Sequence, residues 1–251
     1  GGYSMRTIYA RLICSFLVLA VVFAANIASA QTDLVENGGF ETGNFFGWTV
    51  LNDGGGNWFV YSGTTMPESG NSFLSPPVGV FAAVTDQTSG GSHVLYQDLV
   101  IPGGGEVLCT AIIYYQNAAE DFFTGPDLSP LTSPNQQARI DIISPDADPF
   151  TVSAGVLLNI FQTQPGDPPT LDYTAIDFDL SQFAGSTVRF RVAEVDNVFF
   201  FNFAIDEVSC ISDIAPSTAS IPTLGEWGMI AMAGVLGIAG YIVARRRKAA
   251  A

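Results

Sequence analysis

TVRFRVAEV, residues 187–195, alternates apolar and polar side chains along the first half of its length. Successive side chains of a β-strand project to opposite faces, so this alternation separates an apolar side from a charged side. The apolar side carries Val188, Phe190 and Val192, and the charged side carries Arg189 and Arg191. ARIDI, residues 138–142, repeats the pattern. Both segments are typical of half-buried strands in an antiparallel sheet, with one face on the core and one toward solvent.

Short apolar or alternating runs of this kind recur along the chain, separated by turn residues, and no amphipathic helix of useful length competes with them. The nine runs occupy residues 57–63, 78–86, 93–105, 106–117, 138–149, 153–169, 173–186, 187–197 and 199–210. Their number and spacing predict an all-β fold, a two-sheet antiparallel jelly-roll sandwich.

The first part of the chain has the features of a secretory signal peptide, which we place at residues 5–30. Arg6 and Arg11 precede an apolar run over residues 12–25, and Ala28 and Ala30 fit an A-x-A cleavage site. We expect cleavage after Ala30, which leaves an exported domain over residues 31–210. An uncleaved anchor is the alternative.

The exported part of the chain is strongly acidic. Residues 31–220 hold three arginines against 23 acidic residues, a net charge of −20. A field of this sign repels nucleic acid and anionic lipid, so a nucleic-acid partner is excluded. Solubility and mutual repulsion at a surface explain the charge without any specific cationic partner.

The last part of the chain has the composition of a membrane-spanning tail. Residues 211–220 are small and polar and read as a linker, and residues 227–244 carry no charge. These 18 residues make a helix of about 27 Å, close to the hydrocarbon core of about 30 Å. The basic residues 245–248 would stay in the cytoplasm, which predicts an inner-membrane intermediate with a cytoplasmic C-terminus.

IPTLGEWG, residues 221–228, resembles the IPTL-CTERM sorting signal, in which the pattern IPTLxxWG precedes a helix and a basic cluster. The matching positions are Ile221, Pro222, Thr223, Leu224, Trp227 and Gly228. The resemblance covers residues 221–251. It implies that an exosortase of Gram-negative bacteria recognises and cuts the tail and passes the protein to the cell surface or extracellular matrix. A plain single-span anchor is the alternative.

Two cysteines, Cys109 and Cys210, remain after removal of the signal peptide. Export places them where disulfides persist, so we predict that they are bonded. Two buried free thiols are the alternative, because sequence alone does not show that the residues are close in space.

LVENGGFETGNFFGWT, residues 34–49, and FAIDEVSC, residues 203–210, resemble the first and last strands of galactose-binding-like jelly rolls, the fold of several carbohydrate-binding modules. The resemblance implies a structural Ca²⁺ that ties these strands together, with Glu41 and Asp206 as ligands and Asn37 as a neighbour. Ile205 and Val208 are three apart, which predicts a β-bulge that presents Asp206 and its neighbour. Turn capping or simple exposure of these acids is the alternative.

The same resemblance implies sugar binding, by stacking of exposed aromatic rings with nearby polar groups. The candidates are Trp58, Tyr61, Tyr114, Tyr115 and Phe122, with Asn117 and Asp121 as polar partners. Successive residues Tyr114 and Tyr115 point to opposite faces, so at least one is expected in the core.

Enzymatic function has little support in the sequence. His93, the only histidine, begins a strand beside a Gly-Ser turn and is expected to be exposed and structural. The chain has no G-x-S-x-G, H-E-x-x-H or P-loop motif. The leading hypothesis is a non-enzymatic surface or matrix protein with a calcium-stabilised jelly-roll domain. A carbohydrate-binding module for exopolysaccharide is the more specific version of it. The alternatives are a structural or adhesive protein that binds other proteins and, more remotely, a glycan-degrading hydrolase.

Overall fold

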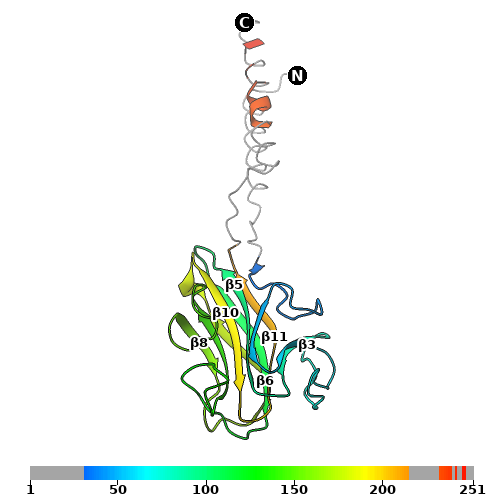
Figure 1. The fold of residues 1–251 in the computed structure, drawn as a ribbon. Coiled ribbons are helices and arrows are strands. Elements are labelled where there is room, and N and C mark those ends of the chain that lie inside the picture. The colour runs from blue at the N-terminus through cyan, green and yellow to red at the C-terminus, as the bar shows by residue number, and fades with distance from the viewer. Residues whose placement is uncertain (1–30, 215–231, 239–240, 242–244, 247–251) are drawn as a thin grey trace. The chain divides into compact units, whose positions relative to one another are not determined.

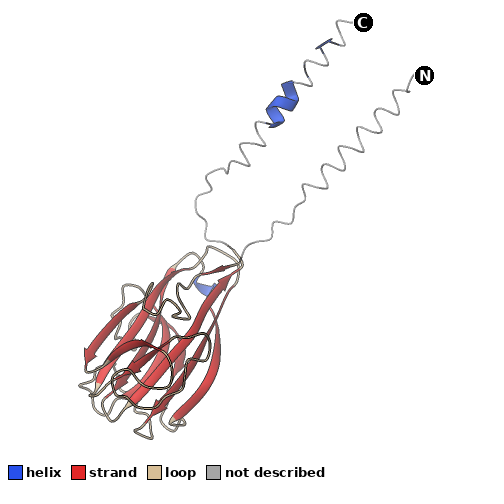
Figure 2. Cartoon of the chain, turned by 90° about the vertical axis from the view of Figure 1, so that its right-hand side faces the viewer, coloured by secondary structure: helices blue, strands red, loops and turns tan. Residues whose placement is uncertain are grey.

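Two antiparallel β-sheets pack face to face across residues 31–214 (Figures 1 and 2). The computed structural model describes residues 31–214, 232–238, 241 and 245–246. The chain divides into one unit over residues 1–215 and a second over residues 216–251. The predicted signal peptide and sorting motif lie outside the described residues.

The strands of sheet A and sheet B pair with antiparallel neighbours throughout. Sheet A has the order β3 (Asn57–Tyr61), β4 (Ala82–Asp86), β11 (Phe201–Ser212), β6 (Val107–Asn117) and β9 (Thr170–Asp179), with β1 (Thr32–Asp33) also paired to β11. Sheet B has the order β2 (Thr49–Gly54), β5 (Gly91–Val100), β10 (Thr187–Asp196), β7 (Gln136–Ile143) and β8 (Val156–Gln162). A short 3-10 helix, η1 (Ser181–Phe183), precedes β10.

The nine predicted runs correspond to strands β3 to β11, which confirms the all-β fold with two antiparallel sheets. The sequence did not reveal β1, which has two residues, or β2, whose sequence TVLNDG is polar and mostly exposed. An edge strand with little buried surface has no apolar pattern to detect. Strand β11 continues to Ser212, two residues past the predicted end of the domain.

Strand β10 lies at the centre of sheet B and shows the predicted alternation. Val188, Phe190 and Val192 are fully buried in the main core between the sheets. Their neighbours in this core include Leu95 and Ile140, from the strands on either side of β10. The apolar stripe read from the sequence is therefore the inner face of sheet B.

The outer face of sheet B is covered over part of its area, whereas the prediction of half-buried strands left it open to solvent. All eight residues of β7 are buried. The segments 124–135 and 144–155 cover this face, and Leu128, Phe150 and Val152 from them form a second apolar cluster with residues of β5 and β10. The polar side of the alternation is therefore also enclosed.

Asp141 on β7 forms ion pairs with two arginines in this enclosed layer. Arg139 donates to both of its oxygens, at 2.6 and 2.8 Å, and Arg191 donates to Asp141 and to the carbonyls of the covering segment. Asn159 donates to Asp141 at 2.8 Å. Burial would raise the pKa of Asp141, but the hydrogen bonds and charges of the two arginines outweigh it and hold the pKa below its usual value.

We predict that Asp141→Asn destabilises the fold by about 3–5 kcal/mol, because it leaves two buried guanidinium groups without a counter-charge. The matched control is Asp98→Asn, which removes an exposed ion pair with Arg189 on the same sheet and is expected to cost about 0–1 kcal/mol. Urea unfolding of both variants measures the difference. Equal losses of unfolding free energy in the two variants would contradict the stabilising role of buried Asp141.

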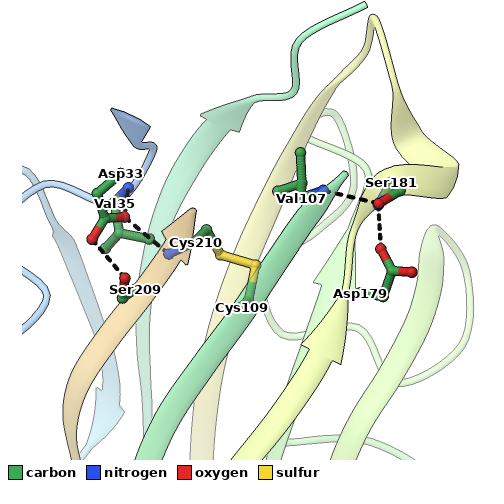
Figure 3. The surroundings of a disulfide bond; sticks show 8 residues. All are labelled: Asp33, Val35, Val107, Cys109, Asp179, Ser181, Ser209 and Cys210. Carbon is green, nitrogen blue, oxygen red and sulfur yellow. Dashed lines mark hydrogen bonds between the residues drawn. A yellow bond between two sulfur atoms is a disulfide. The ribbon is translucent and has the colours of Figure 1, made fainter. Parts of the chain in front are cut away.

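Cys109 and Cys210 form a disulfide that joins β6 to β11 at directly opposed positions in sheet A (Figure 3). Asp33 of β1 lies beside it and accepts hydrogen bonds from the amides of Val35 and Cys210 and from the Ser209 hydroxyl. The disulfide and Asp33 thus hold β1 and β6 to β11, on its two sides.

We predict that the double variant Cys109→Ala, Cys210→Ala loses about 4–5 kcal/mol of unfolding free energy. The two cysteines are 101 residues apart in sequence, and closing a loop of that size removes about this much chain entropy from the unfolded state. Urea unfolding is the measurement, and the wild type in reductant should fall to the same midpoint as the variant. A loss below about 1 kcal/mol would contradict the expectation.

The second unit is described only in part. Residues 232–238, 241 and 245–246 are helical. Within the residues that the structure describes, no helix combines the length and hydrophobicity needed to cross a membrane. Most of the predicted span 227–244 lies outside those residues.

Candidate functional site

The aromatic rings predicted to bind sugar are all inside the protein. Trp58, Tyr115 and Phe122 belong to the main core, and Tyr61 and Tyr114 lie in a smaller cluster on the outer face of sheet A. None of the five is more than 4% exposed. A ring without a free face cannot stack on a sugar, so the prediction is corrected for these five residues.

Tyr114 and Tyr115 point to opposite faces of β6, as predicted, yet both are buried. The segment between β3 and β4 folds over the outer face of sheet A and brings Met66 and Phe73 against Tyr114. The Tyr61 hydroxyl donates to the carbonyl of Leu74 at 2.7 Å and is hydrogen-bonded to the Tyr114 hydroxyl. Burial raises the pKa of both phenols.

The two predicted polar partners hold loops in place. The buried Asn117 amide donates to the carbonyl of Asp121 at 2.7 Å and accepts from Gln136 at 2.9 Å. Exposed Asp121 accepts from the amides of Gly166 and Phe122, which lower its pKa. Their side chains already have partners within the protein.

A surface hollow occurs where the loop between β10 and β11 meets the outer face of sheet A. We call it the Phe199 groove. A hollow of about 440 Å³ is lined by Asn71, Ser72, Gln116, Ala118, Phe199, Phe200 and Asn202. It shares Ser72 and Gln116 with a neighbouring hollow of about 400 Å³ that extends to Asp172 on β9.

The Phe199 groove combines exposed rings with amides. Phe199 is 55% exposed and meets Phe200 edge to face, with ring centroids 5.2 Å apart. The exposed side chains of Asn71 and Gln116 supply donors and acceptors beside the rings. Sequence reasoning missed this pair because the run at residues 199–201 gives no sign that Phe201 enters the core while Phe199 stays in a loop.

The predicted bulge is confirmed in β11, where the pairing with β6 shifts between Asp206 and Ser209. The turn over residues 37–41 docks there, and Val208 donates its amide to the carbonyl of Gly38 at 3.0 Å. A Cβ added to Gly38 would lie 1.7 Å from the Val208 carbonyl oxygen. Glycine is therefore required for this close approach of the first and last parts of the domain.

The residues predicted to hold Ca²⁺ divide into two groups. Asp206 is buried, and its Oδ2 atom has no hydrogen-bond partner. Burial, and then the charges of Glu207 and Glu41, raise the pKa of Asp206 to about 7. Asn37, in contrast, uses its amide within its own turn, with bonds to Asn44, Phe46 and Thr42. Asp206 thus has an oxygen without a partner, whereas the Asn37 side chain is already bonded within its own turn.

His93 is buried, contrary to the prediction of an exposed residue. It lies on the inner face of β5, opposite Glu194 of β10. Burial lowers the pKa of its imidazole to about 4, an effect that the Gly55 backbone opposes in part. Burial likewise raises the pKa of Glu194 well above its usual value and that of Asp196 to about 7.

Residues 219–247 match the family model of the IPTL-CTERM motif. This confirms the resemblance found at residues 221–228. The chain carries a sorting motif, which implies a secreted protein that a sorting enzyme processes and that is sorted to the cell surface. No curated protein matches the chain.

Several solved β-sandwich domains are similar to the chain at low identity. A cleaved adhesin domain of Lys-gingipain from Porphyromonas gingivalis has 17% identity and a TM-score of 0.47, over 73% of this chain and 99% of that one. The module TmCBM61, solved with β-1,4-galactotriose, has 13% identity and a TM-score of 0.42, over 72% and 99%. These scores are too low to carry an argument about function.

Proposed function

We propose that this protein is exported, sorted to the cell surface or matrix by an exosortase, and binds a polysaccharide through the Phe199 groove without catalysing a reaction. The observation that carries the proposal is that exposed Phe199 and half-buried Phe200 lie beside free amides, in a hollow of about 440 Å³. Ligand sites commonly have volumes of about 300–1,000 Å³, with a few polar groups among apolar ones.

The chemistry of the groove suits a neutral sugar. The C–H faces of a sugar ring can pack on Phe199 and Phe200, while Asn71 and Gln116 exchange hydrogen bonds with its hydroxyls. The charge of −20 over residues 31–220 disfavours an anionic polymer.

We expect Phe199→Ala to weaken glycan binding by about 10- to 100-fold, as loss of a stacked ring worth about 1.5–3 kcal/mol implies. The matched control is Phe46→Ala, since Phe46 is 59% exposed and belongs to a different loop. A glycan array with the full chain selects the ligand, and titration calorimetry then compares the two variants.

Failure of the wild-type chain to bind any glycan would overturn the proposal and favour the adhesive, protein-binding alternative. Equal weakening by Phe46→Ala and Phe199→Ala would place the site elsewhere. Release of reducing sugar from a bound glycan would contradict the non-catalytic role.

A structural Ca²⁺ at Glu41 and Asp206 forms part of the proposal. The unpartnered, buried Oδ2 of Asp206 and the nearby Glu41 carboxylate supply the oxygen ligands that this ion prefers. Bound there, the ion would link the turn after β1 to the bulge of β11. Glu41 already accepts the amides of Val80 and Phe81 through Oε1, which fixes its position.

We predict that a calcium chelator lowers the melting temperature of the wild-type chain and that Asp206→Asn abolishes this dependence. Asp177→Asn, an exposed change in the same sheet, should keep it. Differential scanning calorimetry with and without added Ca²⁺ is the measurement. Unchanged melting of the wild type in chelator would rule out the ion.

A further inference from the structure

The inner face of sheet B changes from apolar to acidic near the end of β10. Val188, Phe190 and Val192 are followed on the same face by Glu194 and Asp196, because the alternation of two continues. Glu194 is paired in register with His93 of β5. These three side chains are buried inside the sandwich, with ligand atoms that all lie within 4.8 Å of one another.

The cluster holds polar atoms without partners. Both carboxylate oxygens of Glu194 and the Nε2 atom of His93 are buried and make no hydrogen bond of ordinary geometry. The Thr85 hydroxyl and the Gly55 backbone lie close enough to affect the pKa of Glu194 and of His93, respectively. The three arginines of residues 31–214 form their ion pairs with Asp98 and Asp141 instead. A buried carboxylate that lacks a well-formed hydrogen bond and a counter-charge is costly, so these atoms point to a ligand that the protein chain does not supply.

The hydrogen bond to Asn52 decides which nitrogen of His93 carries the proton. The Asn52 amide donates to Asn57 at 2.7 Å, so the Oδ1 atom of Asn52 is left to face His93 Nδ1, at 2.9 Å. Nδ1 is then the protonated nitrogen and Nε2 the acceptor. A hydrogen bond of this kind from the far nitrogen is what commonly fixes a metal-binding histidine.

Asp196 is held in place from two sides. Its Oδ1 accepts the Gly91 amide at 3.0 Å and its Oδ2 accepts the Gln87 amide at 2.6 Å. The Oε1 atom of Gln87 is itself buried and unpartnered, which adds a further oxygen close to the cluster. Each carboxylate oxygen of Asp196 keeps a lone pair for a second interaction.

We propose that His93, Glu194 and Asp196 bind a zinc ion within the sandwich. One imidazole nitrogen and two carboxylates are ligands that Zn²⁺ accepts, at about 2.0–2.2 Å from each atom. At the tetrahedral angle that Zn²⁺ prefers, two such ligand atoms lie about 3.4 Å apart. The three side chains, whose ligand atoms lie within 4.8 Å of one another, would therefore move toward the ion. The two carboxylates would balance the charge of the ion.

A surface hollow reaches one member of the cluster, Asp196. A hollow of about 240 Å³ is lined by Asp196 and Gln87, together with Phe199 and Phe200. The backbone also closes tightly around the imidazole, since a Cβ on Gly91 would lie 2.0 Å from the Gly55 carbonyl oxygen and 2.9 Å from His93 Nε2. The zinc site therefore lies beneath the same loop that carries the Phe199 groove.

The test uses the full chain, stripped of metal by EDTA and then given Zn²⁺. The wild type should retain about one zinc per chain through gel filtration, measured by elemental mass spectrometry, and its melting temperature should rise with zinc. Glu194→Gln should lose both properties. Without metal it should melt no lower than the wild type, because the amide removes a buried ionisable group.

The controls separate this site from the others. Glu106→Gln, an exposed change outside the cluster, and Asp206→Asn, in the calcium pair, should both keep the zinc. No retained zinc in the wild type would overturn the proposal and leave protonated acids as the state of the cluster. Equal retention by Glu194→Gln would overturn it as well, by placing the zinc on surface carboxylates.

Discussion

Successive side chains of β10 alternate between the two faces of sheet B, and this alternation decides which groups share the interior of this protein. Strand β10 lies between β5 and β7 at the centre of sheet B, and its inner side chains are buried. Because the alternation does not change along the strand, the face that places Phe190 in the core also carries Glu194 into it. A shift of the strand register by one residue would turn the arginines of β10 toward the core in place of these side chains. The register of the sheet and the polarity of the core are therefore linked.

Long connections between strands cover the outer faces of the two sheets, so these faces are also largely packed. The segment between β3 and β4 encloses Tyr114, and the segment after β7 encloses Arg191. Charged and aromatic residues that would be exposed on a bare sheet are thereby turned into structural groups. Function is left to residues on the loops, which agrees with the general division between scaffold and binding surface.

One end of the sandwich gathers the features that remain for function. The loop between β10 and β11 supplies Phe199 and Phe200 both to the Phe199 groove and to the hollow above Asp196. A metal held under this loop would restrain the rings that form the groove. The bulge of β11, with Asp206 and the docked turn at Gly38, is a separate junction, and it ties the start of the domain to its end.

The sequence by itself determined the all-β class, nine of the strands, the inner face of β10 and the sorting motif of the tail. Each of these depends on local periodicity or on a contiguous pattern. It also placed Cys109 and Cys210 as a possible pair and the bulge near Asp206. Only the tertiary structure decided that Trp58 and Tyr115 are buried, that Phe199 is exposed, and that His93 lies against Glu194. Those outcomes depend on which distant segment covers a given face, and strand alternation carries no information about that.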